Sequence, residues 1–191
     1  MSVPRTNRTL AVFLRGLTPG SRETARWQDG LIRLRVSSYL SDLVPPRDYI
    51  TSARCLIIRG NKILVQRDQS GAHVLPGGRL DPDETPEEAM RREVLEETGW
   101  NVGLAALLGF MRFHHLTPRP TEYTFPYPDF IQVVYVADAV EQHDAAKLDD
   151  GWEIGSRFQD TTAISKLKLP AGQRLLLNAA LEQRVLLVPP A

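Results

Sequence analysis

The stretch "GGRLDPDETPEEAMRREVLEETGW", residues 77–100, joins a loop rich in glycine and aspartate to a segment with clear helix signals at both ends. Thr85 suits the N-cap position, Pro86 the first helical position and Glu88 the third, which together form a capping box. Gly99 stands where helices often end in a left-handed residue. The sequence predicts a helix from Pro86 to Thr98.

Three carboxylates occupy one face of this predicted helix. At 100° per residue, Glu93, Glu96 and Glu97 fall within an arc of roughly 100°. Like charges at this spacing destabilise a helix by about 0.2–0.5 kcal/mol per pair, so a divalent cation is the simplest compensation. Arg92 offers another, because it lies four residues from both Glu88 and Glu96 and can bridge them. Without further signals, a plain solvated helix face remains the alternative.

The loop before the helix favours a site over a plain surface. Gly77 and Gly78 allow a ligand to approach the backbone closely, and Asp81, Asp83 and Glu84 add oxygen donors beside the helix start. Hard oxygen donors suit Mg²⁺ or Mn²⁺ and argue against structural zinc.

Nine residues here follow the spacing G-x5-E-x7-R-E-U-x-E-E-x-G-U, where U is a bulky apolar residue: Gly78, Glu84, Arg92, Glu93, Val94, Glu96, Glu97, Gly99 and Trp100. The pattern resembles the box of the Nudix (MutT-like) hydrolase family. Chance would supply its fixed positions about once in 10⁸ windows at average residue usage. The one departure is a tryptophan at the last apolar position, where an aliphatic residue is commoner.

The resemblance implies an α+β fold, a Nudix-type α/β/α sandwich with a mixed β-sheet. It is tight over residues 75–100 and looser over residues 50–184. We therefore expect a Nudix hydrolase domain over 49–191. Residues 1–48 find no support in the resemblance and form an N-terminal extension, interpreted as an added strand, a dimerisation arm or a lid.

The implied activity is hydrolysis of the diphosphate linkage in a nucleoside diphosphate derivative (NDP-X), with water attacking phosphorus. By resemblance, Glu93, Glu96 and Glu97 are ligands of Mg²⁺ or Mn²⁺, joined by the backbone carbonyl of Gly77. Glu84 would be an accessory or outer ligand. The expected partner is thus a small molecule.

The catalytic set inferred from the resemblance is Glu93, Glu96, Arg92 and Glu153. Arg92 would orient the glutamates through charge-assisted hydrogen bonds. Glu93 is the first choice for the general base. Glu153, in the acidic turn "DDGWEIG", is the best candidate outside the box, with an ordinary exposed turn glutamate as the alternative reading.

Two other functions remain open on the same scaffold. One is a module that senses a nucleotide or ADP-ribose without turnover, which loss of box glutamates would favour, and none is lost. The other is an isomerase or an RNA-end pyrophosphohydrolase. Lys plus Arg and Asp plus Glu number 23 each and the pI is near 6.9, so the charge balance disfavours a nucleic-acid partner. A homodimer is compatible with the sequence.

The rest of the chain reads mainly as strands. The run "ARCLIIRGNKILVQRD" predicts a hairpin across Gly60 and Asn61. Alternation over residues 32–36 and apolar runs at 104–115 and 130–140 predict further strands. A helix is expected over residues 171–184.

The segment between the last two strands carries four prolines and predicts an irregular loop. Its Tyr123, Phe125 and Tyr127 are interpreted either as stacking residues for a nucleobase or as loop-packing or dimer-contact residues. His114 and His115, at the end of the preceding strand, could contact a phosphate or a base, but the favoured interpretation is that they are ordinary surface residues.

Location is inferred from what the sequence lacks. The single cysteine, Cys55, lies in an apolar run and is expected to be a buried free thiol. The apolar stretch near the start is too short for a secretory signal, and no segment reaches the length of a membrane span. We therefore expect a cytoplasmic protein without a membrane partner.

Overall fold

The structure of the protein is a computed structural model that describes residues 4–69, 71–148 and 153–187. Its helices and strands are α1 (Arg8–Phe13), β1 (Ser21–Trp27), η1 (Gln28–Gly30), β2 (Ile32–Leu40), η2 (Arg47–Tyr49), β3 (Ile50–Arg59), β4 (Lys62–Asp68), β5 (Gly71–His73), β6 (Gly77–Arg79), α2 (Pro86–Thr98), β7 (Trp100–His115), β8 (Asp129–Gln142), η3 (Asp144–Ala146), β9 (Glu153–Asp160), α3 (Thr161–Ile164) and α4 (Ala171–Leu187).

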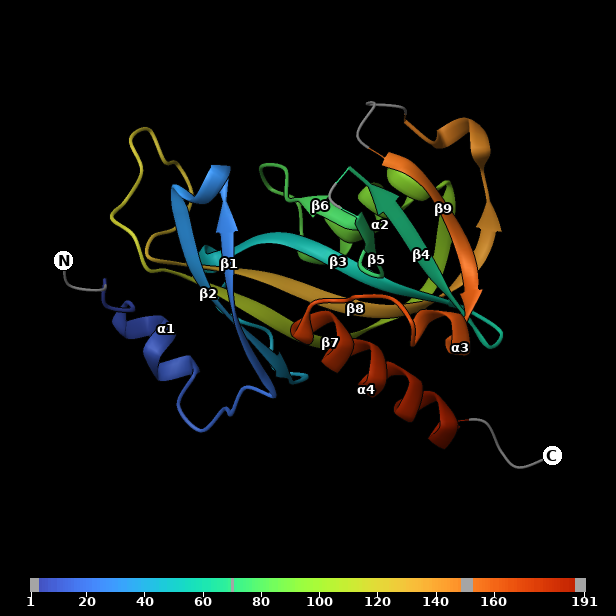
Figure 1. Cartoon of the computed structure of the whole chain (residues 1–191), viewed down its shortest axis with the longest axis horizontal. Coiled ribbons are helices and arrows are strands. Elements are labelled where there is room, and N and C mark those ends of the chain that lie inside the picture. Colours follow the sequence, from blue (N-terminus) through green and yellow to red (C-terminus); the bar gives the residue numbers. More distant parts are fainter. Residues whose placement is uncertain (1–3, 70, 149–152, 188–191) are drawn as a thin grey trace.

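The strands in the described ranges form one mixed sheet in the order β1-β2-β7-β8-β3-β4-β5 (Figure 1). Strand β6 pairs with β3, and β9 pairs with β4. The β3–β8 pair is parallel, whereas β2–β7 and β7–β8 are antiparallel. The predicted mixed sheet is confirmed.

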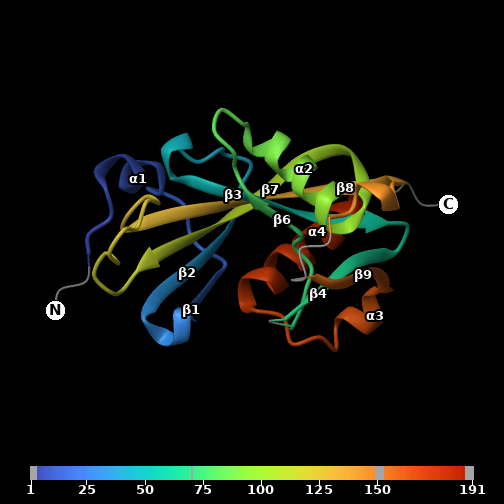
Figure 2. The same cartoon turned by 90° about the horizontal axis from the view of Figure 1, so that it is seen from above.

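Helices cover both faces of the sheet, α2 on one side and α3 and α4 on the other (Figure 2). The alternation of β3 explains the two layers, since Cys55 and Ile57 belong to the core beneath α2, while Leu56 and Ile58 belong to the core beneath α4. The α+β class and the α/β/α arrangement are therefore confirmed.

The hairpin predicted around Gly60 and Asn61 forms, but it is short. Only Ile58 with Ile63 and Arg59 with Lys62 are paired between β3 and β4. The beginning of the same β3 edge pairs with β6, and β4 continues against β9. Apolar periodicity locates strands but does not choose partners, so the sequence did not reveal that β6 takes this edge.

The first 48 residues extend the sheet. Strand β2 pairs with β7, and β1 pairs with β2 at the outer edge. The strand predicted over residues 32–36 lies within β2. Leu10 of α1 is fully buried in the core that also contains α2 residues, so α1 packs on the same side as α2.

Cys55 is a buried free thiol, as expected. Burial raises its pKa to about 12, because the thiolate would lose its hydration. Since the thiolate is the nucleophile, we expect native protein to resist iodoacetamide at pH 8 and to react once unfolded in urea. Mass spectrometry of alkylated protein would measure this, and rapid labelling of the native fold would contradict the burial of Cys55.

Within the described ranges, no helix has both the length and the apolar character needed to cross a membrane.

Candidate active site

The box helix α2 has the predicted ends. The Thr85 side chain accepts a hydrogen bond from the Glu88 backbone, and the Glu88 carboxylate accepts one from the Thr85 backbone at 2.8 Å. Gly99 ends the helix in the left-handed region at φ 75°. The Arg92 contacts shown by the structure do not include Glu88, whose carboxylate serves the cap, so the predicted bridge from Glu88 is wrong.

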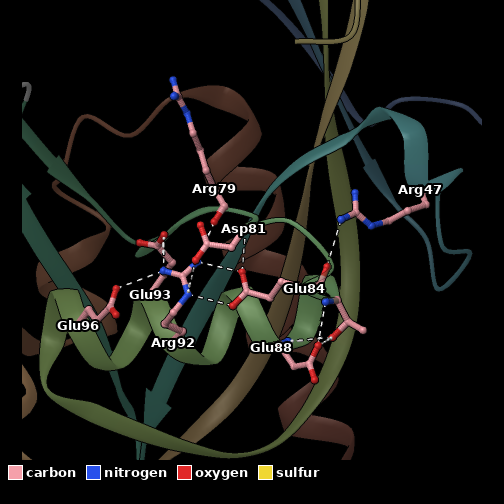
Figure 3. A network of polar contacts seen from close by, with 9 residues as sticks. Arg47, Arg79, Asp81, Glu84, Glu88, Arg92, Glu93 and Glu96 are labelled. Carbon is pink, nitrogen blue, oxygen red and sulfur yellow. Dashed lines mark hydrogen bonds and ion pairs between the residues drawn. The ribbon is translucent and has the colours of Figure 1, made fainter. Parts of the chain in front are cut away.

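Arg92 is the centre of a carboxylate cluster formed by box residues (Figure 3). Its Nε and Nη2 donate to the two carboxylate oxygens of Glu84, both at 2.9 Å. Its Nη1 donates to Glu93 at 2.9 Å and to Glu96 at 3.2 Å. Nη2 also donates to the carbonyl of Arg79 in β6 at 3.0 Å. The Arg92 guanidinium thus connects the loop before α2, the helix α2 and strand β6 through hydrogen bonds.

The charges in this cluster are unequal. Four carboxylates, those of Asp81, Glu84, Glu93 and Glu96, share the one guanidinium of Arg92 and leave an excess of formal negative charge. Hydrogen bonds from Arg92 hold the pKa of the Glu84 carboxyl below its usual range. The same bonds raise the pKa of Arg92 above its already high ordinary value. Arg92 therefore stays charged at every accessible pH.

Glu97 and Glu93 approach β6 at its two glycines. Glu97 accepts a hydrogen bond from the Gly77 backbone N–H at 2.8 Å. A Cβ placed on Gly78 would lie 2.2 Å from the Glu93 carboxylate. A side chain at Gly78 would therefore push the Glu93 carboxylate away from its position beside β6.

The structure thus brings together Gly77, Glu84, Arg92, Glu93, Glu96 and Glu97. The backbone of Glu153 begins β9, but its side chain lies outside the part that the structure describes. Among the described residues, no group of three or more His, Cys, Asp or Glu side chains is arranged so that it could hold a metal ion. Instead, the box carboxylates accept hydrogen bonds from Arg92 and from the β6 backbone.

Two cavities lie on the other side of β6. The first, here called the β1 cavity, has a volume of about 580 Å³ and is lined by β1 residues together with Val36, Arg54, Asp68, His73, Leu75, Met111, Phe113, Gln132, Pro170 and Gln173. The second, the loop cavity, has about 480 Å³ and is lined by residues 120–125 together with Trp27, Gln28, Ile32, Thr51, Ser52, Arg54, Arg79, Phe130 and Gln132.

Three residues line both cavities and were missed by the sequence analysis: Trp27, Arg54 and Gln132. They come from β1, β3 and β8, and no motif connects them. The sequence signal for two of them was that a polar residue, Arg54 in β3 and Gln132 in β8, interrupts a largely apolar strand.

The expectation that His114 and His115 are surface residues is wrong. They are 5% and 1% exposed. The Nδ1 of His114 contacts Asp129 at 2.8 Å, and the Nε2 of His115 contacts the Tyr123 hydroxyl at 3.0 Å. Burial lowers the pKa of His115, so the neutral ring is favoured in this position.

The aromatic residues of the predicted loop divide into two groups. Tyr123 and Phe125 line the loop cavity, and the guanidinium of Arg79 lies 4.5 Å from the centre of the Phe125 ring. Tyr127 instead packs within the loop and donates to the Thr117 carbonyl at 3.0 Å. Base stacking by Tyr123 and Phe125 stays a prediction.

Sequence comparison places these features in a family. Residues 48–178 match the model of the NUDIX domain. A Bacillus subtilis protein described as a candidate 8-oxo-dGTP diphosphatase is 53% identical over 47 residues, or 25% of this chain and 32% of that protein. A MutT-like protein of Streptomyces ambofaciens is 39% identical over 66 residues, or 34% of this chain and 43% of that protein. The matched segments thus span less than half of these curated relatives.

Solved structures agree in fold. A Bacillus subtilis pyrophosphohydrolase aligns with a TM-score of 0.57 and 21% identity, covering 84% of this chain and 97% of that one. A NUDIX hydrolase from Nitrosomonas europaea aligns with a TM-score of 0.54 and 16% identity, covering 76% and 98%. Together with the family model over residues 48–178, the box geometry shows that the chain belongs to the Nudix (MutT-like) hydrolase family.

Proposed function

We propose that the protein is a divalent-metal-dependent pyrophosphohydrolase that cleaves the diphosphate linkage of a nucleoside diphosphate derivative. The observation that carries the proposal is the gathering of the box carboxylates around Arg92 and the β6 glycines. Arg79 of β6 connects this cluster to the loop cavity, because its carbonyl accepts from Arg92 and the residue lines that cavity. Such a site can hold a polyphosphate close to acidic side chains. The names of the relatives, a diphosphatase and a pyrophosphohydrolase, support the same reaction class.

The donor set fits Mg²⁺ or Mn²⁺ in its chemistry, while its carboxylates are bonded to Arg92 and β6 and would have to turn toward the ion. Glu93, Glu96 and Glu97 offer hard carboxylate oxygens, and the cluster has more formal negative charge than Arg92 balances. These glutamates and the Gly77 carbonyl would hold the ion, with Glu84 as an accessory ligand. When bound, the ion supplies charge neutralisation at the phosphate and a lower pKa for attacking water.

The protein's own residues have separate tasks. Arg92 orients Glu93 and Glu96 through charge-assisted hydrogen bonds. Glu93 is proposed as the base that accepts the proton of the attacking water, with Glu153 as the candidate from outside the box. Arg54, which lines both cavities, supplies positive charge for the substrate phosphates.

The setting that we propose is a reducing cytoplasm, which the buried, single Cys55 supports. The proposed partner is a small nucleotide derivative. Formation of a homodimer through the N-terminal extension stays a prediction.

Turnover of a substrate panel tests the function. We expect phosphate or nucleotide release with Mg²⁺ or Mn²⁺ from at least one of nucleoside triphosphates, nucleotide sugars, ADP-ribose, dinucleoside polyphosphates and coenzyme A. Release should stop in EDTA and return with added metal. Binding without turnover across the panel would favour a sensing module. A 5′-triphosphorylated RNA is assayed beside the panel, and turnover restricted to it would favour RNA-end hydrolysis.

Replacing Arg92 by alanine is expected to weaken metal affinity. Without the guanidinium, Glu93 and Glu96 lose the bonds that orient them, and residues in such a supporting role typically contribute 10–100-fold to metal affinity or activity. We therefore expect the Mg²⁺ concentration for half-maximal activity to rise by about 10–100-fold.

The matched control is Arg91→Ala on the same helix. Arg91 pairs with Glu87 at 2.8 Å and donates to the carbonyls of Val102 and Gly103, away from the cluster. Metal titrations of both variants would measure the difference. Equal metal dependence in Arg92→Ala and wild type would contradict the proposal that Arg92 orients the metal-binding glutamates.

A further inference from the structure

The loop before α2 is fixed at both of its ends to the segment where β3 begins. At one end, the Leu80 backbone N–H donates to the Thr51 carbonyl of β3 at 3.2 Å. At the other end, the Glu84 carbonyl accepts from Nη2 of Arg47 at 3.1 Å (Figure 3). Arg47 belongs to η2, which directly precedes β3. The residues between these two bonds are therefore held as a closed loop beside β3.

Arg47 is prepared for this contact by its own segment. It begins η2 directly after Pro45 and Pro46, whose rings fix two backbone φ angles. The Tyr49 N–H donates to the Pro46 carbonyl at 3.1 Å and closes the turn. The Nη1 of Arg47 also donates to the Ile50 carbonyl at 3.3 Å. The guanidinium thus bonds one carbonyl in its own segment and one in the loop before α2.

Glu84 is held from two sides by two arginines. Arg47 bonds its backbone carbonyl, while Arg92 bonds both oxygens of its carboxylate at 2.9 Å. The Glu84 N–H donates to the Asp81 carbonyl at 3.2 Å, and the Asp81 N–H donates to the Glu84 carboxylate at 2.9 Å. Arg92 therefore sets the direction of the Glu84 carboxylate, and Arg47 sets the position of the backbone that carries it.

The loop needs an anchor because its backbone includes an uncommon conformation. Asp83 has φ of 65°, in the left-handed region that non-glycine residues seldom occupy. A conformation of this kind persists only where the surrounding structure holds it. Glu84 is the next residue, so the bond from Arg47 acts directly on this turn. Without that bond, relaxation of the turn would carry Glu84 away from Arg92.

No part of the box motif contains Arg47. It directly precedes the segment that matches the NUDIX domain model, residues 48–178, and is 37 positions from Glu84 in the sequence. The hydrogen bonds that the structure shows for Arg47 both go to backbone carbonyls. Unlike the bonds of Arg92, they do not compete with a metal ion for a carboxylate. Arginine suits this task, since its planar group donates in several fixed directions.

We propose that Arg47 is a positioning residue of the active site, which acts through the Glu84 carbonyl to hold Glu84 and the start of α2 in the geometry that accepts the divalent ion. The inference rests on the proposed function for the role of that ion. It gives the N-terminal extension a part in the site that differs from a lid or a dimerisation arm.

Hydrogen exchange of the metal-free protein tests the positioning role without metal or substrate. Arg47 is exposed, so its replacement by alanine leaves no cavity in the core. In Arg47→Ala, we expect amides of residues 80–85 to exchange at least about threefold faster, as loss of one hydrogen bond predicts. Peptides from β7 and β8 should exchange as in wild type. Unchanged exchange over residues 80–85 would overturn the proposal, and so would a uniform increase along the chain.

Calorimetry with Mn²⁺ alone measures the consequence for the metal site. We expect the dissociation constant to rise by about three- to tenfold in Arg47→Ala, a range set by the net strength of one hydrogen bond. Arg47→Lys should recover part of this loss, because an ammonium group still donates to one carbonyl. Equal Mn²⁺ affinity in Arg47→Ala and wild type would overturn the proposed link between Arg47 and the metal site.

Arg174→Ala is the matched control. Arg174 of α4 also bonds two backbone carbonyls, those of Ile164 and Leu167, at 3.4 and 2.5 Å. Helix α4 covers the face of the sheet opposite to α2 (Figure 2). The variant removes the same charge and two similar bonds, so exchange over residues 80–85 and Mn²⁺ affinity should stay as in wild type. An equal loss of Mn²⁺ affinity in Arg174→Ala would overturn the specific role of Arg47.

The positioning role and the proposed function fail in different ways. If wild type neither binds Mn²⁺ nor hydrolyses any substrate, the metal-dependent hydrolase is rejected, while exchange over residues 80–85 still decides whether Arg47 positions the loop. If wild type binds Mn²⁺ and turns over substrate, but Arg47→Ala equals it in exchange and in affinity, the function stands and the role of Arg47 is rejected.

Discussion

Glu97→Gln is expected to lower kcat/KM by on the order of 100-fold or more, the loss typical when one electrostatic group of a catalytic site is removed. The amide keeps the size of the side chain and an oxygen that can still accept the Gly77 N–H, now bonded at 2.8 Å. It loses the negative charge needed to hold a divalent ion. The fold should therefore be kept while activity falls.

Glu88→Gln is the control for this variant. It is on the same helix and removes the same charge, but Glu88 serves the N-terminal cap, where glutamine also functions. Steady-state kinetics at saturating Mg²⁺, together with thermal unfolding, would distinguish loss of activity in Glu97→Gln from a general effect of removing a charge from α2. If the activity of Glu97→Gln stays within a few-fold of wild type, Glu97 is not a metal ligand, and Glu93 and Glu96 are the remaining candidates.

Gly77→Ala is expected to disrupt the site through the backbone. Gly77 has φ of 130°, and a Cβ there would lie 2.3 Å from the Ala53 carbonyl oxygen and 2.9 Å from the Arg54 Cα. Both are backbone atoms of β3, so the clash cannot be relieved by rotating a side chain. Strand β6 must move away from β3, which breaks the Gly77 bond to Glu97 and separates Gly77 from Arg54, its register partner in β3.

The backbone conformation alone costs about 1–3 kcal/mol for a non-glycine residue, and the clash adds to this cost. We therefore expect a lower urea midpoint and a loss of turnover on the order of 100-fold, since misplacement by about an ångström has effects of that size. Gly71→Ala is a matched control, because Gly71 has φ of 133° and no atom within 4 Å of the added Cβ. Comparable turnover losses in both variants would show that strain, and not contact with β3, is responsible.

Much of the box could be read from the sequence. The α2 caps, the helix bounds and the common face of Glu93, Glu96 and Glu97 all depend on residues about four or fewer positions apart, which helical geometry fixes. The role of Arg92 was only half predicted. It was expected to reach Glu88 and Glu96. It reaches Glu96 but not Glu88, and it extends back across the loop to Glu84, eight residues away.

Other features could not be read because they depend on distant segments. His114 and His115 look like an exposed polar pair at a strand end, but the folded chain supplies Asp129 and Tyr123 as partners. A buried polar group is stable only when such a partner is present, and sequence spacing does not reveal it.

The sequence by itself determined the family, the box helix and the set of acidic side chains, because these follow from local spacing and residue chemistry. Only the tertiary structure placed Arg54 opposite Gly77 and Trp27 at the wall of both cavities. The physical reason is strand pairing: which edge β6 occupies and where β1 lies are set by packing of the whole sheet, so neither is encoded in any short stretch.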